Sequence, residues 1–352
     1  MRPRRSLTLL VAGCVVAGQV VAEPGYQDYG TPESDQAAPD KAIEIASITT
    51  DRGIVTRPGR LTIEPSLSHA YSNSTTVAIE GYTVIPALVV GLINISEIQR
   101  DIFVGAFTFK YGFSSRLEAS LRIPYLVINE DLRERQAFQG TPVDNLREAS
   151  GQGLGDVELS TRFQLTDGSG GWPYLLGTFR VKAPTGESPF DVERRQLLDN
   201  DGNPIGIVLG ERPTGSGFWS FEPGISFIYP SDPAVLFGNF SYVRTMPDDK
   251  GEDNGGTIKP GDVVRFGFGM GFAFNERTSF SLGYDHSVIP KTSVEFDTSL
   301  TDAAFDRVQV GSLSFGMSQR LTPNASLGLT VSIGVTEQAP NSEIALRLPL
   351  SF

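Results

Sequence analysis

Two serine–histidine neighbours are the first residues in this chain that suggest chemistry. Ser68 precedes His69 and Ser287 follows His286, and these are the two histidines of the sequence. A serine activated by a histidine is the nucleophile and base of many hydrolases. Both pairs lie in stretches where apolar and polar residues alternate, which indicates strands, and neighbours on a strand point to opposite faces. The adjacency therefore argues against a dyad, and we expect no enzyme activity and no catalytic residue.

A second candidate is the acidic run from 199 to 203, which reads Asp-Asn-Asp-Gly-Asn and resembles the start of a calcium loop. Its glycine comes too early for the twelve-residue loop, and no glutamate follows at the bidentate position. The tip of a hairpin explains the run better. A further acidic, glycine-rich run, 248 to 256, either is solvated or meets divalent ions that bridge lipopolysaccharide. We expect no metal site and no cofactor.

Charged residues at every second position are the third candidate. Each has apolar sequence neighbours, so the charges occupy one face of their strands and the apolar residues the other. We expect these side chains to line the lumen of a barrel. They either form cross-strand pairs that brace a narrow lumen or define a path for a solute. The residues are Arg60, Glu64, Lys110, Glu118, Arg122, Glu158, Arg162, Arg180, Lys182, Glu222, Arg265, Asp285 and Arg347.

The strands that must position these charges are clearest at the end of the chain. Residues 342–352 place Ile344, Leu346, Leu348, Leu350 and Phe352 on one face and polar side chains between them. About twelve such stretches follow one another from Arg60 onward. After residue 22 no apolar run is long enough for a transmembrane helix, so a closed barrel is the remaining way to cross a bilayer. The sequence predicts an all-β, antiparallel, up-and-down outer-membrane barrel of about twelve strands.

The connections between these strands alternate in length, as the turns and loops of outer-membrane barrels do. We expect short turns on the periplasmic side and long loops on the outer side. In the tenth strand, Val308 and Val310 fall on the face opposite to that of Leu313, although all three are apolar, which suggests a bulge. The short turns are expected at 112–116, 167–171, 230–233, 275–277 and 321–324, and the long loops at 73–100, 129–152, 184–215, 245–261 and 290–306.

The N-terminus reads as an export signal followed by a polar segment. Residues 1–22 carry three arginines, an apolar run and a small-residue cleavage site. Cys14 ends a lipoprotein-like box, but the apolar residues after it argue against lipidation. Residues 23–58 form a periplasmic tail or a plug inside the pore, and 59–352 form the barrel. Without the signal, 26 basic residues face 41 acidic ones, a net charge of −15, so nucleic acid is not expected as a partner.

The first long loop is unusually apolar, since it contains Val84-Ile85-Pro86 and Leu88-Val89-Val90. Three interpretations stay open. The stretch 77–98 either lengthens a hairpin above the membrane, folds inward as a constriction, or adds two strands. An apolar gate at these six residues would suit a hydrophobic solute.

Several motifs resemble the outer-membrane transporter-like family named for the meta-pathway of phenol degradation, among the fatty-acid-transporter-like barrels. The resemblance implies an outer-membrane barrel linked to the uptake of aromatic compounds, and it brings no catalytic residues. Gly155, Asp156, Pro184 and Gly186 lie where a long loop meets a strand, so we expect them to set turns and bulges. The motifs are Tyr-Gly-Phe-Ser-Ser-Arg-Leu-Glu at 111–118 with Ile-Pro-Tyr at 123–125, Gly-Leu-Gly-Asp-Val-Glu at 153–158, Lys-Ala-Pro-Thr-Gly at 182–186 and Pro-Gly-Asp at 260–262.

Together these features predict a channel that passes a small hydrophobic or aromatic solute across the outer membrane of a Gram-negative bacterium. The alternative is a structural or secretion-type pore that serves an exported protein partner. The expected partners are outer-membrane lipid, lipopolysaccharide, the solute, and the barrel-assembly machinery, which would read the last strand ending at Phe352.

Overall fold

The computed structural model describes residues 55–85, 88–137, 143–198, 204–249, 257–290, 293–295 and 307–352. All of them belong to one unit, Gln36–Phe352. The predicted signal peptide, Cys14, most of the segment 23–58, Pro86 and the run 199–203 lie outside the described residues. No described helix is long and apolar enough to cross a membrane.

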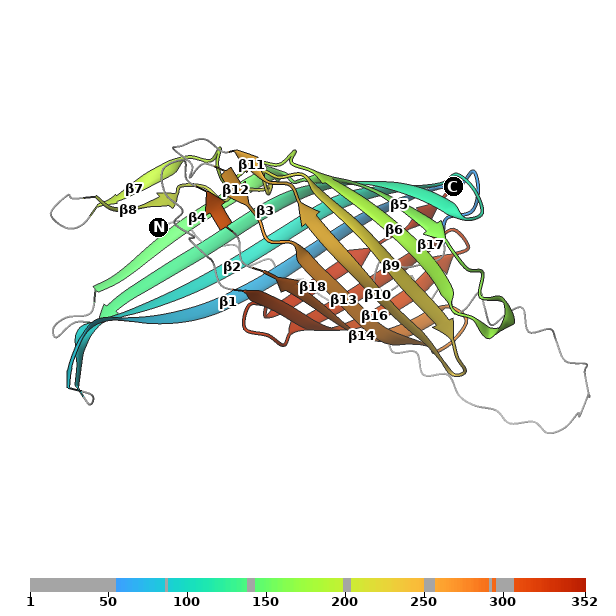
Figure 1. Ribbon diagram of the computed structural model, residues 1–352. Coiled ribbons are helices and arrows are strands. Elements are labelled where there is room, and N and C mark those ends of the chain that lie inside the picture. The colour runs from blue at the N-terminus through green and yellow to red at the C-terminus, as the bar shows by residue number, and fades with distance from the viewer. Residues whose placement is uncertain are drawn as a thin grey trace, which may run out of the picture. The chain divides into compact units, whose positions relative to one another are not determined.

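The main sheet closes on itself into an antiparallel barrel of twelve strands (Figure 1). β16 pairs with β17, and β1 pairs with β18 and β19, so the ring has no free edge. This confirms the predicted fold class. The barrel strands are β1 (Leu61–Ile85), β2 (Leu88–Gly112), β3 (Leu117–Ala137), β4 (Val143–Leu154) with β5 (Val157–Gln164), β6 (Tyr174–Ala183), β9 (Ser220–Pro230), β10 (Ala234–Thr245), β13 (Val263–Ala273), β14 (Thr278–Ile289), β16 (Val308–Thr322), β17 (Ala325–Gly334), and β18 (Ser342–Arg347) with β19 (Leu350–Ser351).

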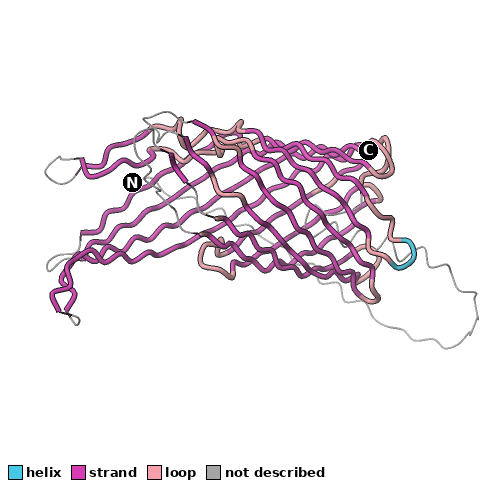
Figure 2. The backbone as a smooth tube through the Cα atoms, viewed as in Figure 1, coloured by secondary structure: helices cyan, strands magenta, loops and turns pink. Residues whose placement is uncertain are grey.

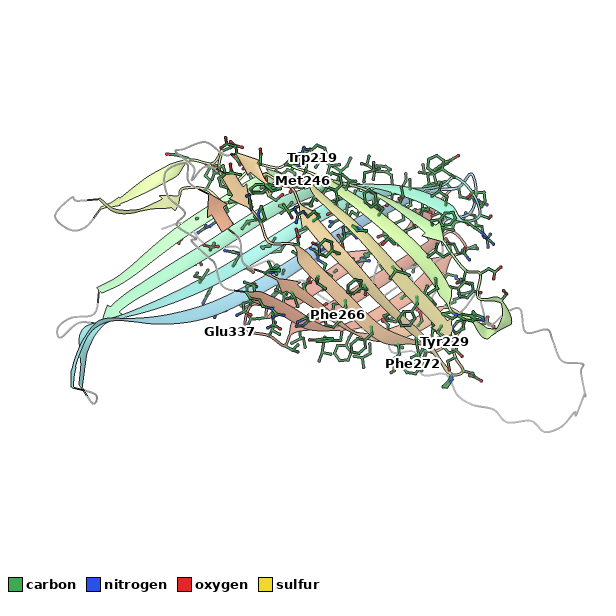
Figure 3. All side chains as sticks on the ribbon, viewed as in Figure 1. Trp219, Tyr229, Met246, Phe266, Phe272 and Glu337 are labelled. Carbon is green, nitrogen blue, oxygen red and sulfur yellow. The ribbon has the colours of Figure 1, made fainter. Side chains whose placement is uncertain are left out.

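Alternation explains why these segments form a barrel. Along β10, Leu236, Phe240 and Tyr242 are exposed, whereas Phe237 and Ser241 between them are buried. The same pattern on the other strands gives a barrel with large apolar side chains outside, where hydrocarbon would cover them. Aromatic and apolar side chains cover the outer surface from Trp219 and Met246 at one end to Tyr229 and Phe272 near the other (Figure 3).

Short turns connect the strands at one end of the barrel, as predicted. The amides of Phe113 and Ser114 donate to the carbonyl of Leu117, and Ser231 donates in the same way to Ala234. The turn after β5 contains a short 3-10 helix, η1 (Ser169–Gly171). In outer-membrane barrels this end faces the periplasm, so we call it the periplasmic end and the opposite one the outer end.

The first two outer connections are strands where loops were expected. β1 and β2 are each 25 residues long. They stay paired from Leu61 opposite Tyr111 at one end to Ile85 opposite Leu88 at the other. β3 and β4 are likewise paired across most of 129–152. These ribbons extend beyond the rest of the barrel (Figure 2). The long loops predicted here are wrong, whereas the alternative in which 77–98 lengthens a hairpin is confirmed. The segment 77–95 is rich in Val and Ile, which favour strands.

Smaller sheets occupy the remaining outer connections. β7 (Arg194–Leu198) pairs with β8 (Pro204–Leu209) in one hairpin. β11 (Asp248–Asp249), β12 (Thr257–Lys259) and β15 (Ser293–Glu295) form a second, three-stranded sheet.

The bulge expected in the tenth strand is absent from the described register. β16 pairs with β14 without interruption from Val308 to Gln319. The pairing therefore keeps Val308 and Val310 on the inner face of one regular strand. No bulge is needed there, because an inner position can hold an apolar residue, as the buried Phe237 on β10 does.

Two glycines on the inner face give a test of packing. A Cβ on Gly269 would lie 2.4 Å from the carbonyl oxygen of Leu282 and 2.5 Å from the ring of Phe237. A Cβ on Gly328 would meet nothing closer than 3.9 Å. We expect Gly269→Ala to lower the free energy of unfolding by about 1–3 kcal/mol because backbone must shift, and Gly328→Ala to change it little. Urea unfolding in detergent measures both, and equal stabilities would contradict the described packing.

Candidate solute path in the lumen

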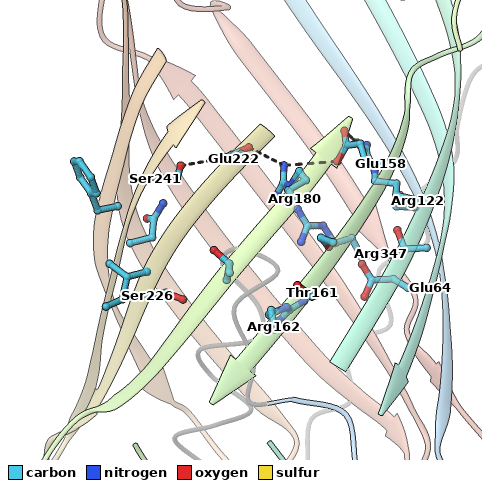
Figure 4. Close-up of a pocket in the computed structure, with 17 residues that line it drawn as sticks. Glu64, Arg122, Glu158, Thr161, Arg162, Arg180, Glu222, Ser226, Ser241 and Arg347 are labelled. Atoms are coloured by element: carbon cyan, nitrogen blue, oxygen red, sulfur yellow. Dashed lines mark hydrogen bonds and ion pairs between the residues drawn. The ribbon is translucent and has the colours of Figure 1, made fainter. Parts of the chain in front are cut away.

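A cavity of about 350 Å³ lies inside the barrel and is lined mainly by polar and charged side chains (Figure 4). It is bounded by strands β1, β2, β3, β5, β6, β9, β10 and β18. Seven of the predicted lumen residues line it directly, together with hydroxyl groups such as those of Ser226 and Ser241. The seven are Glu64, Arg122, Glu158, Arg162, Arg180, Glu222 and Arg347.

Five charges of alternating sign form a ladder across this cavity. Arg122 pairs with Glu158 at 3.2 Å, and Arg180 reaches Glu158 at 3.6 Å and Glu222 at 3.7 Å. Arg265 completes the ladder by pairing with Glu222 at 3.2 Å. The strand register builds this arrangement, since Arg122 lies opposite Glu158 and Arg180 lies opposite Glu222.

The ladder presents its positive charges to the lumen. The side chains of Arg122, Arg180 and Arg265 are 36–43% exposed, whereas those of Glu158 and Glu222 are 19% and 14% exposed. The Ser241 hydroxyl also donates to Glu222 at 2.7 Å and further covers that carboxylate. A solute in the cavity therefore meets guanidinium groups before it meets carboxylates.

The wall opposite the ladder carries no charge along its middle. The inner positions of β16 from 312 to 318 and of β17 from 326 to 334 are Ser, Thr and Gly only. Ser314 and Ser318 are buried while Phe315 is exposed, which fixes the inward parity of β16. The lumen therefore has one charged side and one neutral side.

At the outer end, Asp156 holds the connection between β6 and β9 against the barrel wall. Its carboxylate accepts hydrogen bonds from the amides of Gly186 at 3.2 Å and Ser216 at 2.9 Å, and from the Ser216 hydroxyl at 2.6 Å. Lys182 adds an ion pair at 3.0 Å. We call these four residues the Asp156 clasp. Two of the motif residues expected to set turns, Asp156 and Gly186, thus meet in one cluster. The clasp joins Asp156 to residues 30 and 60 positions further along the chain.

The clasped connection contributes its own side chains to the outer lumen. Arg212 pairs with Glu130 on β3, and Arg100 on β2 donates to the same carboxylate at 2.6 Å. Phe190 and Phe218 pack edge to face with ring centres 5.7 Å apart, and Phe218 is buried. The connection is therefore packed, and it narrows the outer end of the barrel.

At the periplasmic end, the chain before β1 enters the barrel. The amide and the hydroxyl of Thr56 both donate to Glu118 Oε2 at 2.6 Å. Glu118 also pairs with Arg162 at 3.3 Å, and nearby Lys110 pairs with Glu64 at 2.9 Å. These bonds connect the N-terminal segment to the inner wall formed by β3 and β5.

An apolar cluster packs inside this end of the barrel, and no sequence pattern predicted it. Val55 packs against Leu176, Ile228, Val235 and Phe237, which lie on three neighbouring strands, β6, β9 and β10. Leu176 is 1% exposed and Ile228 is 0% exposed. The available signal was an apolar residue on the inner parity of each of these strands near its periplasmic end.

The structure places the other predicted residues as follows. Lys182 belongs to the Asp156 clasp. The Asp285 carboxylate lies over Gly267 on the inner face of β13, where a Cβ on that glycine would be 2.3 Å away. Arg60 is exposed just before β1. The backbone at Val84, Ile85, Leu88, Val89 and Val90 belongs to the β1–β2 ribbon, so the stretch lengthens a hairpin, and its role as a gate stays a prediction.

The histidines have partners other than serine. His69 Nε2 lies 2.7 Å from Asp101 Oδ1, and its ring stacks on Phe103. His286 Nδ1 lies 2.9 Å from the Tyr284 hydroxyl. Within the described ranges, no group of three His, Cys, Asp or Glu is placed to hold a metal ion.

Solved structures share the fold. An outer membrane channel from Pseudomonas putida F1 has a TM-score of 0.51 at 14% identity, covering 85% of this chain and 98% of that one. The Pseudomonas putida toluene transporter TodX has a TM-score of 0.42 at 10% identity, with 88% and 96% covered. The translocator domain of autotransporter NalP from Neisseria meningitidis has a TM-score of 0.43 at 9% identity, covering 90% of this chain and 96% of that one. No protein-family model matches the chain. The likeness to the first structure shows that this chain has the fold of an outer-membrane channel.

Proposed function

We propose that this protein is an outer-membrane channel that passes a small solute with hydrophobic or aromatic character. The observation that carries the proposal is the cavity inside a closed twelve-stranded barrel, which is lined mainly by charged and polar side chains and not filled by a core of large side chains. Open barrels with a polar interior conduct solutes, whereas filled ones serve as anchors. The apolar stretch 84–93 and the motifs that resemble those of the phenol meta-pathway family support an apolar or aromatic body for the solute.

The residues that directly precede β1 are the gate of this channel in our proposal. Val55 and Thr56 lie inside the periplasmic end, bound to the apolar cluster and to Glu118. Residues that occupy the lumen at this end reduce the cross-section available to a solute. This supports the plug interpretation of residues 23–58 over the free tail.

Liposome swelling tests the proposed function. We expect liposomes that contain the full-length protein to admit small neutral aromatics such as phenol faster than empty liposomes, and a variant lacking residues 23–57 to admit them faster still. Conductance in planar bilayers of the same two proteins measures the gate separately. If neither protein admits any small solute, the uptake proposal fails and a pore for an exported protein partner becomes the better explanation.

A further inference from the structure

Among the described residues that line the lumen cavity, four arginines face three glutamates, so the charges are not balanced. Three guanidinium groups, from Arg122, Arg180 and Arg265, share the two carboxylates of Glu158 and Glu222. The ladder therefore holds one more positive charge than negative charge. Because the carboxylates lie behind the guanidinium groups, the surplus is turned toward the solute path.

Arg347 adds a second positive charge to the same cavity. It lies on the inner face of β18 between Ser66 on β1 and Gly328 on β17, so neither cross-strand neighbour is acidic. The closest acidic residue along β1, Glu64, is already paired with Lys110 at 2.9 Å. Among the described residues Arg347 has no ion pair and no side-chain hydrogen bond, so its five N–H donors are available to a ligand.

The surplus has the opposite sign to the protein as a whole. The chain carries a formal net charge of −12, yet the cavity concentrates arginines. A guanidinium is planar and binds a carboxylate through two parallel hydrogen bonds, which a solute without an anionic group cannot satisfy. A positive potential inside a narrow, low-dielectric wall also raises the local concentration of anions.

We propose that the cavity is a subsite for a carboxylate, with Arg347 as the residue that binds it and the Arg122–Arg180–Arg265 side of the ladder as its electrostatic support. This inference rests on the proposed channel function and narrows its solute class. The solute is a small organic acid whose apolar or aromatic body follows the carboxylate through the lumen.

Reversal potentials in planar bilayers test this subsite, with sodium benzoate and benzylammonium chloride gradients as probes of matched size and opposite charge. We expect the wild-type channel to prefer benzoate over sodium and chloride over benzylammonium. Arg347→Gln removes a charge several ångströms from the permeating ion, so we expect the anion preference to fall about threefold or more. Arg347→Lys keeps the charge and should retain most of the preference.

Arg244→Gln is the matched control, because Arg244 lies on the outer face of β10, where it pairs with Asp262 at 2.5 Å. We expect it to leave the anion preference unchanged. All variants are first shown to be folded by their heat-dependent migration on gels. If the wild-type channel does not conduct, the Arg347 and Arg244 variants are compared in the Val55→Asp background.

The outcomes separate the two proposals. An open channel that prefers cations, or whose anion preference Arg347→Gln leaves intact, overturns the carboxylate subsite and leaves the channel in place. A channel that conducts in neither the wild-type nor the Val55→Asp form overturns the channel function itself.

Discussion

Replacing Val55 by aspartate should open the channel. Val55 is buried in an apolar cluster with Leu176, Ile228 and Phe237, which cannot solvate a carboxylate. Burying an unpaired charge costs far more than the contact of one valine stabilises, so the segment before β1 must leave the periplasmic end. We expect single-channel conductance to rise severalfold, measured in planar bilayers at fixed salt.

Val55→Leu is the matched control, because it keeps an apolar side chain at the same position. It should conduct like the wild type. Thr56→Val removes the hydroxyl that donates to Glu118 but keeps the hydrogen bond from the backbone amide to the same carboxylate. We expect it to give an intermediate conductance. If Val55→Asp conducts no better than Val55→Leu, the N-terminal segment is not what limits the periplasmic end.

Removing the carboxylate of Asp156 should release the connection between β6 and β9 at the outer end. Asp156→Ala leaves the amides of Gly186 and Ser216 and the charge of Lys182 without their acceptor. Leaving such groups unpaired costs about 1–3 kcal/mol, which corresponds to roughly a five- to 150-fold increase in the open population of the connection. We expect trypsin to cut after Arg194 or Arg195 in β7 of the folded variant at a correspondingly higher rate.

Asp167→Ala is a suitable control, since Asp167 accepts from Ser169 in an exposed periplasmic turn and does not touch the clasp. Its cleavage between β6 and β9 should match that of the wild type. Fragments resolved by mass spectrometry identify the cut site. Equal protection of Asp156→Ala and the wild type would show that other contacts, such as the Arg212–Glu130 pair, hold the connection alone.

The barrel itself was predictable because its strands are specified locally. Alternation in stretches such as Phe221–Tyr229 requires a two-faced strand, and alternating connection lengths require an up-and-down order. The same parity placed Arg122, Glu158, Arg180 and Glu222 on the inner face, where the cavity brings them together.

What the sequence did not predict depends on contacts between distant segments. The Asp156 clasp joins residues from three regions, and only the fold brings Ser216 to Asp156. The Val55 cluster was missed because one or two apolar residues at the inner positions of each of three strands are common until the strands are known to be neighbours. The long β1–β2 ribbon was one of three interpretations of the stretch 77–98, and the sequence could not choose among them because apolar residues are compatible with all three.

The neutral strip of β16 and β17 has a consequence for how a solute travels. Guanidinium groups lie on the ladder strands and on β18, whereas the inner positions in the middle of β16 and β17 carry only hydroxyls and glycines, so the electric field inside has a component across the barrel. An elongated molecule with a charged head and an uncharged tail would be rotated by this field, head toward the arginines, and would move through the protein in one preferred orientation.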